Sequence, residues 1–191
     1  MSTRVRGEPE VRTTGGVVRG GWENAVAVFR GIPYAAPPVG SRRFAAPDAA
    51  QPWQGIRDAL QFGPPVPQAD FAGAVMSSVS GGAADGSADC LTLNVWSPDL
   101  GAAGLPVMMW IHGGRYLQGG SRNPHSDGRT LAQSGVVVVS VNYRVGVEGF
   151  ANIAGAPDNR GILDQIAAVP RSSRHGSSGF SKSSKPASPT R

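Results

Sequence analysis

The sequence is poor in several residue types that would point to a particular class of protein. It has a single cysteine, Cys90, which excludes an internal disulfide and any cysteine-rich metal site. No apolar run approaches the roughly 20 residues of a membrane-spanning helix, and the first residues lack the apolar segment of a secretory signal peptide. We therefore expect a cytoplasmic protein with no membrane contact.

Charged residues are also sparse, and their distribution along the chain is more informative about a partner than the net charge. The formal net charge of +5 at first suggests a nucleic-acid partner. All 13 acidic residues, however, precede residue 170, and up to that point the charge is balanced. The excess comes from five residues near the C-terminus: Arg171, Arg174, Lys182, Lys185 and Arg191. Such a run, without a motif and with one aromatic residue, is typical of a solvated end, so we expect no nucleic-acid partner.

Composition divides the chain into three parts. Residues 1–11 are charged and turn-rich, and we expect a flexible arm. Residues 12–169 contain the apolar runs needed for a core. Residues 170–191 are rich in serine, arginine and lysine, contain no acidic residue, and are expected to be disordered. The abrupt change at residue 170 raises the hypothesis that this tail is an out-of-frame or otherwise foreign end.

Apolar patterning predicts several strands. Residues 13–19 and 25–30 are β-rich runs separated by Gly20 and Gly21, which favours a small hairpin or meander. Residues 89–96 alternate apolar and polar side chains, as strands do. Two runs without alternation, 107–111 and 135–141, predict strands buried on both faces of a parallel sheet.

Two helices are expected. One covers residues 127–133 between the two apolar runs, with Gly135 as its C-terminal cap, which makes a βαβ-like unit and implies a parallel sheet. The second begins with Asp158 as N-cap and places Ile162, Ile166 and Val169 on one side. The predicted fold class is therefore α/β.

A His-Gly-Gly turn, residues 112–114, directly follows the first apolar run. Two glycines allow a sharp turn, and they let backbone N–H groups face a cleft without interference from a Cβ. N–H groups arranged in this way stabilise the oxyanion of an acyl-transfer transition state. The tripeptide alone is also compatible with a glycine-rich surface turn.

Five motifs occur in an order known from one enzyme family. They are Phe29-Arg-Gly-Ile-Pro-Tyr-Ala35 with Pro37-Pro-Val-Gly40 and Arg43-Phe44; Asp89-Cys-Leu-Thr-Leu-Asn-Val-Trp96; Trp110-Ile-His-Gly-Gly114; Val141-Asn-Tyr-Arg144 with Gly149-Phe150; and Asn159 with Gly161-Ile-Leu-Asp-Gln165. Over residues 12–169 the chain resembles the type-B carboxylesterases, the carboxylesterase/cholinesterase family, whose bacterial members are often called para-nitrobenzyl-type esterases.

The resemblance implies the N-terminal part of an α/β-hydrolase fold, in which small antiparallel N-terminal strands precede the start of a central, mostly parallel sheet. The fold would be incomplete. The implied chemistry is serine-dependent hydrolysis of a small-molecule carboxylic ester, which needs no metal or organic cofactor. In this family the His-Gly-Gly loop supplies part of the oxyanion hole, which assigns that role to the backbone N–H groups of Gly113, Gly114 and Arg115.

Two positions depart from the family pattern. Where the family usually has Gly or Ala, this chain has Arg115, which keeps the N–H but must place a guanidinium. It could point along the rim toward an acidic partner or substrate. Cys90 stands where many members have half of a disulfide, and Val66 takes the place of the other half. The resemblance thus implies that Cys90 is a buried free thiol, not a nucleophile.

No catalytic triad can be assigned. The family's nucleophile is the serine of a Gly-x-Ser-x-Gly elbow, which does not occur in the 191 residues. His112 is a loop residue in this family, His125 lies in a polar loop, and His175 lies in the tail. The sequence therefore predicts a truncated carboxylesterase that keeps the oxyanion loop and is inactive alone.

Two alternatives remain for such a chain. One is a non-catalytic binding or interaction module of the same fold, and the other is a half that complements a separate C-terminal portion. If the strand next to residues 107–111 is missing, that run becomes an open apolar edge and the chain should be poorly soluble.

Overall fold

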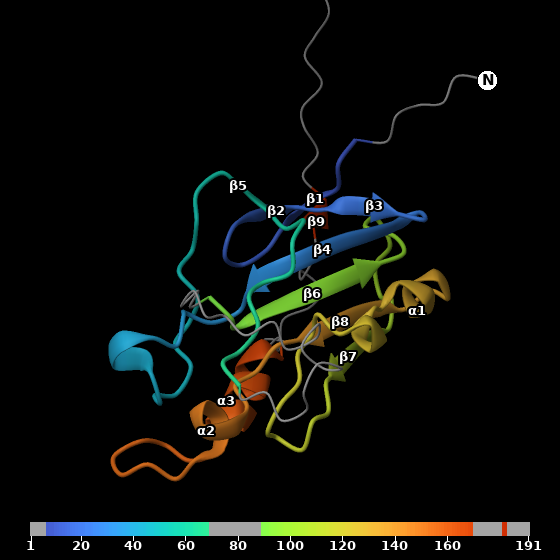
Figure 1. Ribbon diagram of the computed structural model, residues 1–191. Helices are drawn as coiled ribbons and strands as arrows, with labels where there is room; N and C mark the ends of the chain where they lie inside the picture. The colour runs from blue at the N-terminus through green and yellow to red at the C-terminus, as the bar shows by residue number, and fades with distance from the viewer. Residues whose placement is uncertain (1–6, 69–88, 170–180, 183–191) are drawn as a thin grey trace, which may run out of the picture.

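The computed structural model describes residues 7–68, 89–169 and 181–182, and their strands form two sheets (Figure 1). The five-stranded sheet has the order β3-β4-β6-β8-β7. The four-stranded sheet has the order β5-β2-β1-β9. Phe29, Val95 and Val141 of the first sheet share a buried core with Val11 and Val18 of the second.

The bounds of the strands are as follows. The larger sheet contains β3 (Gly21–Glu23), β4 (Val26–Pro33), β6 (Thr92–Ser97), β7 (Val107–Ile111) and β8 (Val137–Val141). The smaller one contains β1 (Glu10–Arg12), β2 (Val17–Arg19), β5 (Ile56–Asp58) and β9 (Ser181–Lys182).

A hairpin occurs near the predicted place, but its turn lies elsewhere. The antiparallel pair is β3–β4, with Gly21 opposite Val28. Asn24 and Ala25 form the turn, with φ of 47° and 67°. Positive φ at both central residues gives the backbone twist that suits a two-residue hairpin. Gly20 instead lies where the chain passes from one sheet to the other, and a Cβ there would clash with the Val28 carbonyl.

The predicted βαβ unit is confirmed. β7 and β8 pair in parallel, with Val107 opposite Val137, and α1 (Arg129–Gln133) connects them. Gly135 follows the end of α1 with φ of 94°, and its N–H donates to the Ala132 carbonyl over 3.0 Å. This left-handed glycine after the helix fits the predicted cap. The sheet is mixed, because β6 is antiparallel to both β4 and β8.

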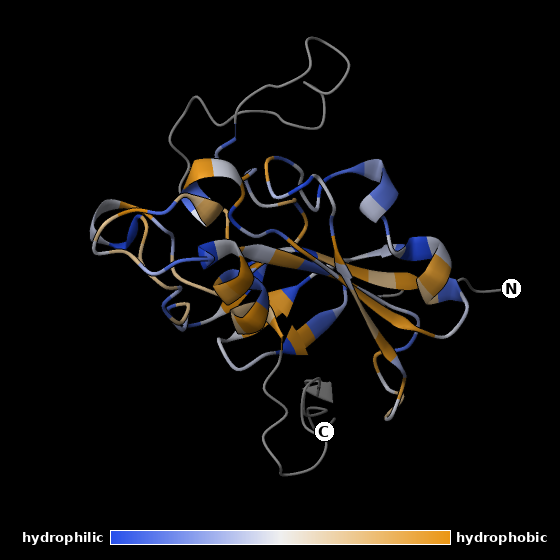
Figure 2. Cartoon of the chain, turned by 90° about the horizontal axis from the view of Figure 1, so that it is seen from below, coloured by the Kyte–Doolittle hydropathy of each residue, from blue (hydrophilic) through white to orange (hydrophobic). Residues whose placement is uncertain are grey.

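The prediction that residues 107–111 are buried on both faces is wrong, although the strand forms. β7 is the edge of its sheet among the described residues. Val107 is 66% exposed, Trp110 42% and Ile111 44%. β8 lies one position inside the sheet and is buried as expected. Figure 2, which views the chain from below, shows hydrophobic residues along strands of the sheet.

The last helix differs from its prediction in both its start and its buried face. It is α3 (Arg160–Ala168), and the capping position is taken by Asn159, with φ of 54°, not by Asp158. The buried residues are Arg160, Gly161, Asp164 and Ala168, whereas Ile166 is 56% exposed and Val169 48%. Polar partners explain this, because Asp164 receives hydrogen bonds from Arg144, which pulls the polar side of the helix inward.

Three short helices complete the described part: α2 (Gly146–Phe150) and the 3-10 helices η1 (Gly40–Arg42) and η2 (Pro124–Ser126). No helix in the described ranges is long and apolar enough to cross a membrane. β1 begins inside the stretch predicted as an arm. β9, inside the predicted tail, pairs antiparallel with β1, and residues 170–180 and 183–191 lie outside the described residues.

Candidate active site

The His-Gly-Gly turn follows β7 at its carboxyl end, beside the carboxyl end of β8. Because β7 and β8 are parallel, residues 112–114 and Asn142–Tyr143 leave the sheet together. Ligands of open α/β sheets bind at this edge. The sequence therefore places two loops, one from each strand, at a single location.

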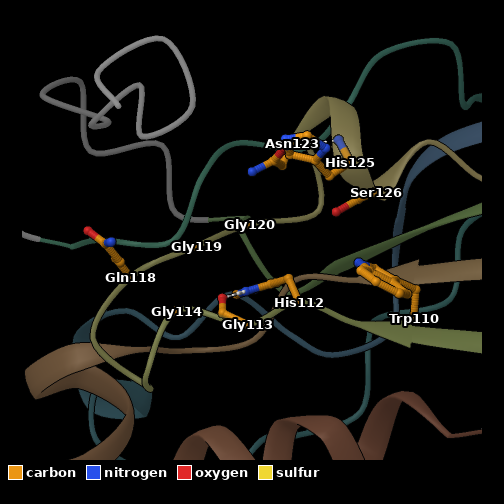
Figure 3. A pocket seen from close by; sticks show the side chains of 10 residues that line it. All are labelled: Trp110, His112, Gly113, Gly114, Gln118, Gly119, Gly120, Asn123, His125 and Ser126. Carbon is orange, nitrogen blue, oxygen red and sulfur yellow. Dashed lines mark hydrogen bonds between the residues drawn. The ribbon is translucent and has the colours of Figure 1, made fainter. Parts of the chain in front are cut away.

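His112 is buried and held by two contacts. Its ring stacks on Tyr143, with centroids 4.3 Å apart and an interplanar angle of 16°. Its Nδ1 lies 3.0 Å from the Gly113 carbonyl oxygen (Figure 3). Since a carbonyl can only accept, Nδ1 carries the proton. Burial lowers the pKa of His112, and only the Gly113 bond opposes that shift. The imidazole is therefore neutral near pH 7.

Three consecutive carbonyls of this loop are hydrogen-bonded. Tyr143 Oη donates to the His112 carbonyl over 2.7 Å, and His112 Nδ1 donates to that of Gly113. The Gly114 carbonyl accepts from the N–H groups of Leu117 (3.0 Å) and Gln118 (3.2 Å).

A trans peptide directs its N–H opposite to its C=O, and the described residues contain no cis peptide. The bonded carbonyls thus fix the directions of the N–H groups of Gly113, Gly114 and Arg115. Within the described ranges these three N–H groups have no hydrogen-bond partner.

The loop turns back through two left-handed residues that are not glycine. Arg115 and Tyr116 have φ of 58° and 62°, and the Leu117 N–H bond to Gly114 closes the turn. Such a conformation strains a residue with a Cβ. Gly114, with φ of 131°, could carry no Cβ, because the atom would clash with the Gln118 carbonyl.

A cavity of about 250 Å³ adjoins the loop. Figure 3 shows Asn123 and His125 on the side of the cavity opposite His112. Of the predicted site residues, Gly113 and Gly114 line the cavity, whereas Arg115 does not and is exposed at the turn. His125, an exposed residue of η2, shares the cavity with His112. The complete lining is Trp110, His112, Gly113, Gly114, Gln118, Gly119, Gly120, Asn123, His125 and Ser126.

The far end of the loop is fixed by residues that sequence reasoning did not select. Gln68 makes two bonds to Gly119: its Nε2 donates to the carbonyl over 2.9 Å, and its Oε1 accepts from the N–H over 2.7 Å. Asn142 Oδ1 accepts from the Ser121 N–H over 2.7 Å. The position of Asn142 and Tyr143 directly after a parallel strand was a usable signal for them. Nothing in the sequence around Gln68 offered one.

Cys90 is a buried free thiol, as expected, and packs in one cluster with Val66. Burial raises the pKa of Cys90 to about 12, so the nucleophilic thiolate is scarce. The described residues contain no group of three His, Cys, Asp or Glu side chains that could hold a metal ion.

Comparison with known proteins matches residues 7–170 to the carboxylesterase family. The chain belongs to this family. It is 42% identical over 165 residues to the para-nitrobenzyl esterase of Bacillus subtilis, covering 83% of this chain and 33% of that protein. It is 44% identical to the fumonisin B1 esterase of Sphingopyxis macrogoltabida, covering 82% of this chain and 29% of that protein.

Solved structures agree on the fold. A thermophilic PNB esterase aligns with a TM-score of 0.77 at 41% identity, over 85% of this chain and 34% of that one. A carboxylesterase of Geobacillus stearothermophilus aligns with a TM-score of 0.71 at 40% identity, over 83% and 33% of the two chains. The chain therefore spans about a third of the length of these carboxylesterases and has the fold of the corresponding part.

Proposed function

We propose that residues 112–115 form the oxyanion-hole loop of a serine carboxylic-ester hydrolase. The observation that carries the proposal is the set of three bonded carbonyls, which turns the N–H groups of Gly113, Gly114 and Arg115 to the other side of the loop. When a nucleophile attacks an ester carbonyl, its oxygen becomes negatively charged. N–H groups already in place stabilise that charge without the cost of reorganisation.

The remaining chemistry must come from residues that this sequence does not contain. Ester hydrolysis of this kind needs a serine, a histidine base and an acid, and no Gly-x-Ser-x-Gly elbow occurs in residues 1–191. We therefore expect residues 1–191 by themselves to bind and polarise an ester at most, without turning it over. Its substrate in a completed site is a small-molecule carboxylic ester.

The exposed edge of β7 supports complementation over a free-standing interaction module. Among the described residues no strand pairs with its outer side, and its apolar residues suit a further strand from the rest of a carboxylesterase. Co-expression with the matching remainder of the para-nitrobenzyl esterase should then restore hydrolysis of a chromogenic ester such as para-nitrophenyl acetate. The 191-residue chain alone should give the buffer rate.

A chimera tests the role of the loop directly. Residues 1–169 are fused to the corresponding remainder of the Bacillus subtilis relative. Gly114→Ala forces the loop to move, because the added Cβ clashes with Gln118, and kcat should fall about 100-fold or more with KM little changed. Gly7→Ala, where a Cβ meets nothing within 4 Å, is the matched control. An active chimera that is indifferent to Gly114→Ala would refute the assignment.

A further inference from the structure

The geometry points to Tyr143 as a positioning residue: we propose that its hydroxyl and ring together set the directions of the Gly113 and Gly114 N–H groups. The importance of those directions rests on the proposed oxyanion function. The directions themselves can be measured without any hydrolysis.

The hydroxyl acts on the first peptide. Tyr143 Oη donates to the His112 carbonyl over 2.7 Å, and both residues are buried. That carbonyl and the Gly113 N–H belong to one planar trans peptide, so the bond points the N–H away from Tyr143. Without the hydroxyl, the His112 carbonyl would lose its donor.

The ring acts on the second peptide through His112. Its face lies against the imidazole at 4.3 Å and 16°, which limits rotation of the His112 side chain. In this orientation Nδ1 faces the Gly113 carbonyl. That bond fixes the peptide that carries the Gly114 N–H.

Packing around Gly113 does not by itself impose the direction of its peptide groups. A Cβ built on Gly113 would meet no atom within 4 Å, and glycine reaches many backbone conformations at low cost. The hydrogen bonds must therefore select one of them.

Tyr143 can do so because it is itself immobile. It is 2% exposed, lies in a buried cluster with Leu91 and Val145, and is the second residue after β8. The next residue, Arg144, is bound by Asp164 through both its backbone N–H (3.0 Å) and its guanidinium. Tyr143 thus connects the loop to the buried core through one aromatic side chain.

The test uses N–H residual dipolar couplings of the weakly aligned, ¹⁵N-labelled 191-residue chain. Tyr143→Phe keeps the ring and removes the hydroxyl, and should change the Gly113 coupling. Tyr143→Leu removes both and should change Gly113 and Gly114. Ser134→Ala is the control, because it removes a hydroxyl that donates to the Leu131 carbonyl over 2.7 Å at the end of α1, outside the loop. Couplings from β6 and β8 must fit the wild-type alignment, which separates reorientation from unfolding.

Unchanged Gly113 and Gly114 couplings in folded Tyr143→Leu would overturn the proposal. Should that variant not fold, the tautomer of His112 in the wild-type chain tests the proposal. The arrangement requires the neutral His112 proton on Nδ1, which the ¹⁵N shifts of the ring report. A proton on Nε2 would overturn it.

The same substitution in the chimera separates this proposal from the proposed function. Tyr143→Phe should lower kcat on the order of 10-fold, less than loss of a whole donor, with KM little changed. Altered couplings in the chain, together with an active chimera whose kcat is indifferent to Gly114→Ala, would support the positioning role and reject the oxyanion role. An active chimera with unaltered kcat and couplings would reject the positioning role alone.

Discussion

Arg144 and Asp164 form a buried ion pair in which Nη2 lies 2.7 Å from Oδ1, with the two side chains 2% and 0% exposed. Asp164 Oδ2 also accepts from Nε over 2.8 Å and from the Arg144 backbone N–H over 3.0 Å. The fourth hydrogen bond of the arginine goes to the Ala45 carbonyl, 2.8 Å from Nη1. One carboxylate thereby fastens α3 to the residue that follows Tyr143.

Removing that carboxylate should be severely destabilising. Asp164→Ala leaves the Arg144 charge buried without its partner, and we expect the free energy of unfolding to fall by about 3–5 kcal/mol. Urea denaturation followed by circular dichroism measures it. Asp48→Ala is the control, because the Asp48–Arg42 pair is exposed at 66% and 45%, and should change the free energy little. Equal effects at the two sites would contradict the role given to Asp164.

Cys90 should be unreactive until the chain unfolds. Burial raises the pKa of its thiol to about 12, so at pH 8 the thiolate is a minute fraction and is also inaccessible. Labelling with Ellman's reagent should be slow in buffer and complete in strong denaturant. Labelling in buffer at the rate of a small free thiol would show that the cluster around Val66 is open.

Arg115→Gly should relieve backbone strain. Arg115 has φ of 58°, a conformation that costs an L-residue roughly 1–2 kcal/mol relative to glycine, offset in part by the greater freedom of glycine in the unfolded chain. We expect a small rise in melting temperature. Arg122→Gly makes the same change where φ is not positive and should lower it. A lower melting temperature for both would mean that the Arg115 side chain makes a stabilising contact.

His112 should make stability depend on pH below neutrality. Burial lowers its folded-state pKa, whereas the unfolded value is about 6.5. Above pH 6.5 both states are neutral and the contribution is complete. As pH falls below 6.5, the unfolded state takes up a proton first, so stability falls until the folded pKa is reached. The slope is at most about 1.4 kcal/mol per pH unit.

His112→Phe isolates this contribution, since the variant keeps an aromatic ring beside Tyr143 and cannot titrate. Between pH 7 and pH 5 the unfolding free energy of the wild type should fall relative to that of the variant. Parallel profiles would show that the imidazole is solvated in the folded state.

The β7 edge should control solubility. Val107→Lys places a charge on a residue that is 66% exposed at an open edge, and charges at such edges oppose strand pairing between molecules. We expect less aggregation by light scattering. Val39→Lys, 45% exposed in a loop, should change it less. If the two variants reduce aggregation equally, the added net charge is the cause and the β7 edge is not.

Elements recognised by the apolar and glycine pattern of their own residues were predictable. The β7-α1-β8 unit, the Gly135 cap and the buried β8 follow from local pattern. The α3 face did not, because Ile166 and Val169 look core-facing until Arg144, 20 residues upstream, is seen to draw Asp164 inward. The motif likewise located Gly113 and Gly114. The place of Tyr143 after a parallel strand was a sequence signal, but the bonds of Tyr143 and Gln68 to the loop join residues far apart in the sequence and are seen only in the fold.

The pairing of β4 with β6 has a consequence for synthesis on the ribosome. Val28 of β4 lies opposite Trp96 of β6. The ribosome must therefore add dozens of residues after β4 before β6, its neighbour in the sheet, has been made. At roughly 5–20 residues per second this takes several seconds. Throughout that time β4 has only the short β3 as a neighbour in its sheet, and Phe29, fully buried in the finished fold, lacks its β6 neighbours. Ribosome-associated chaperones, which shield apolar segments near the exit tunnel, should therefore bind this chain early, before the residues of the candidate active site have been made.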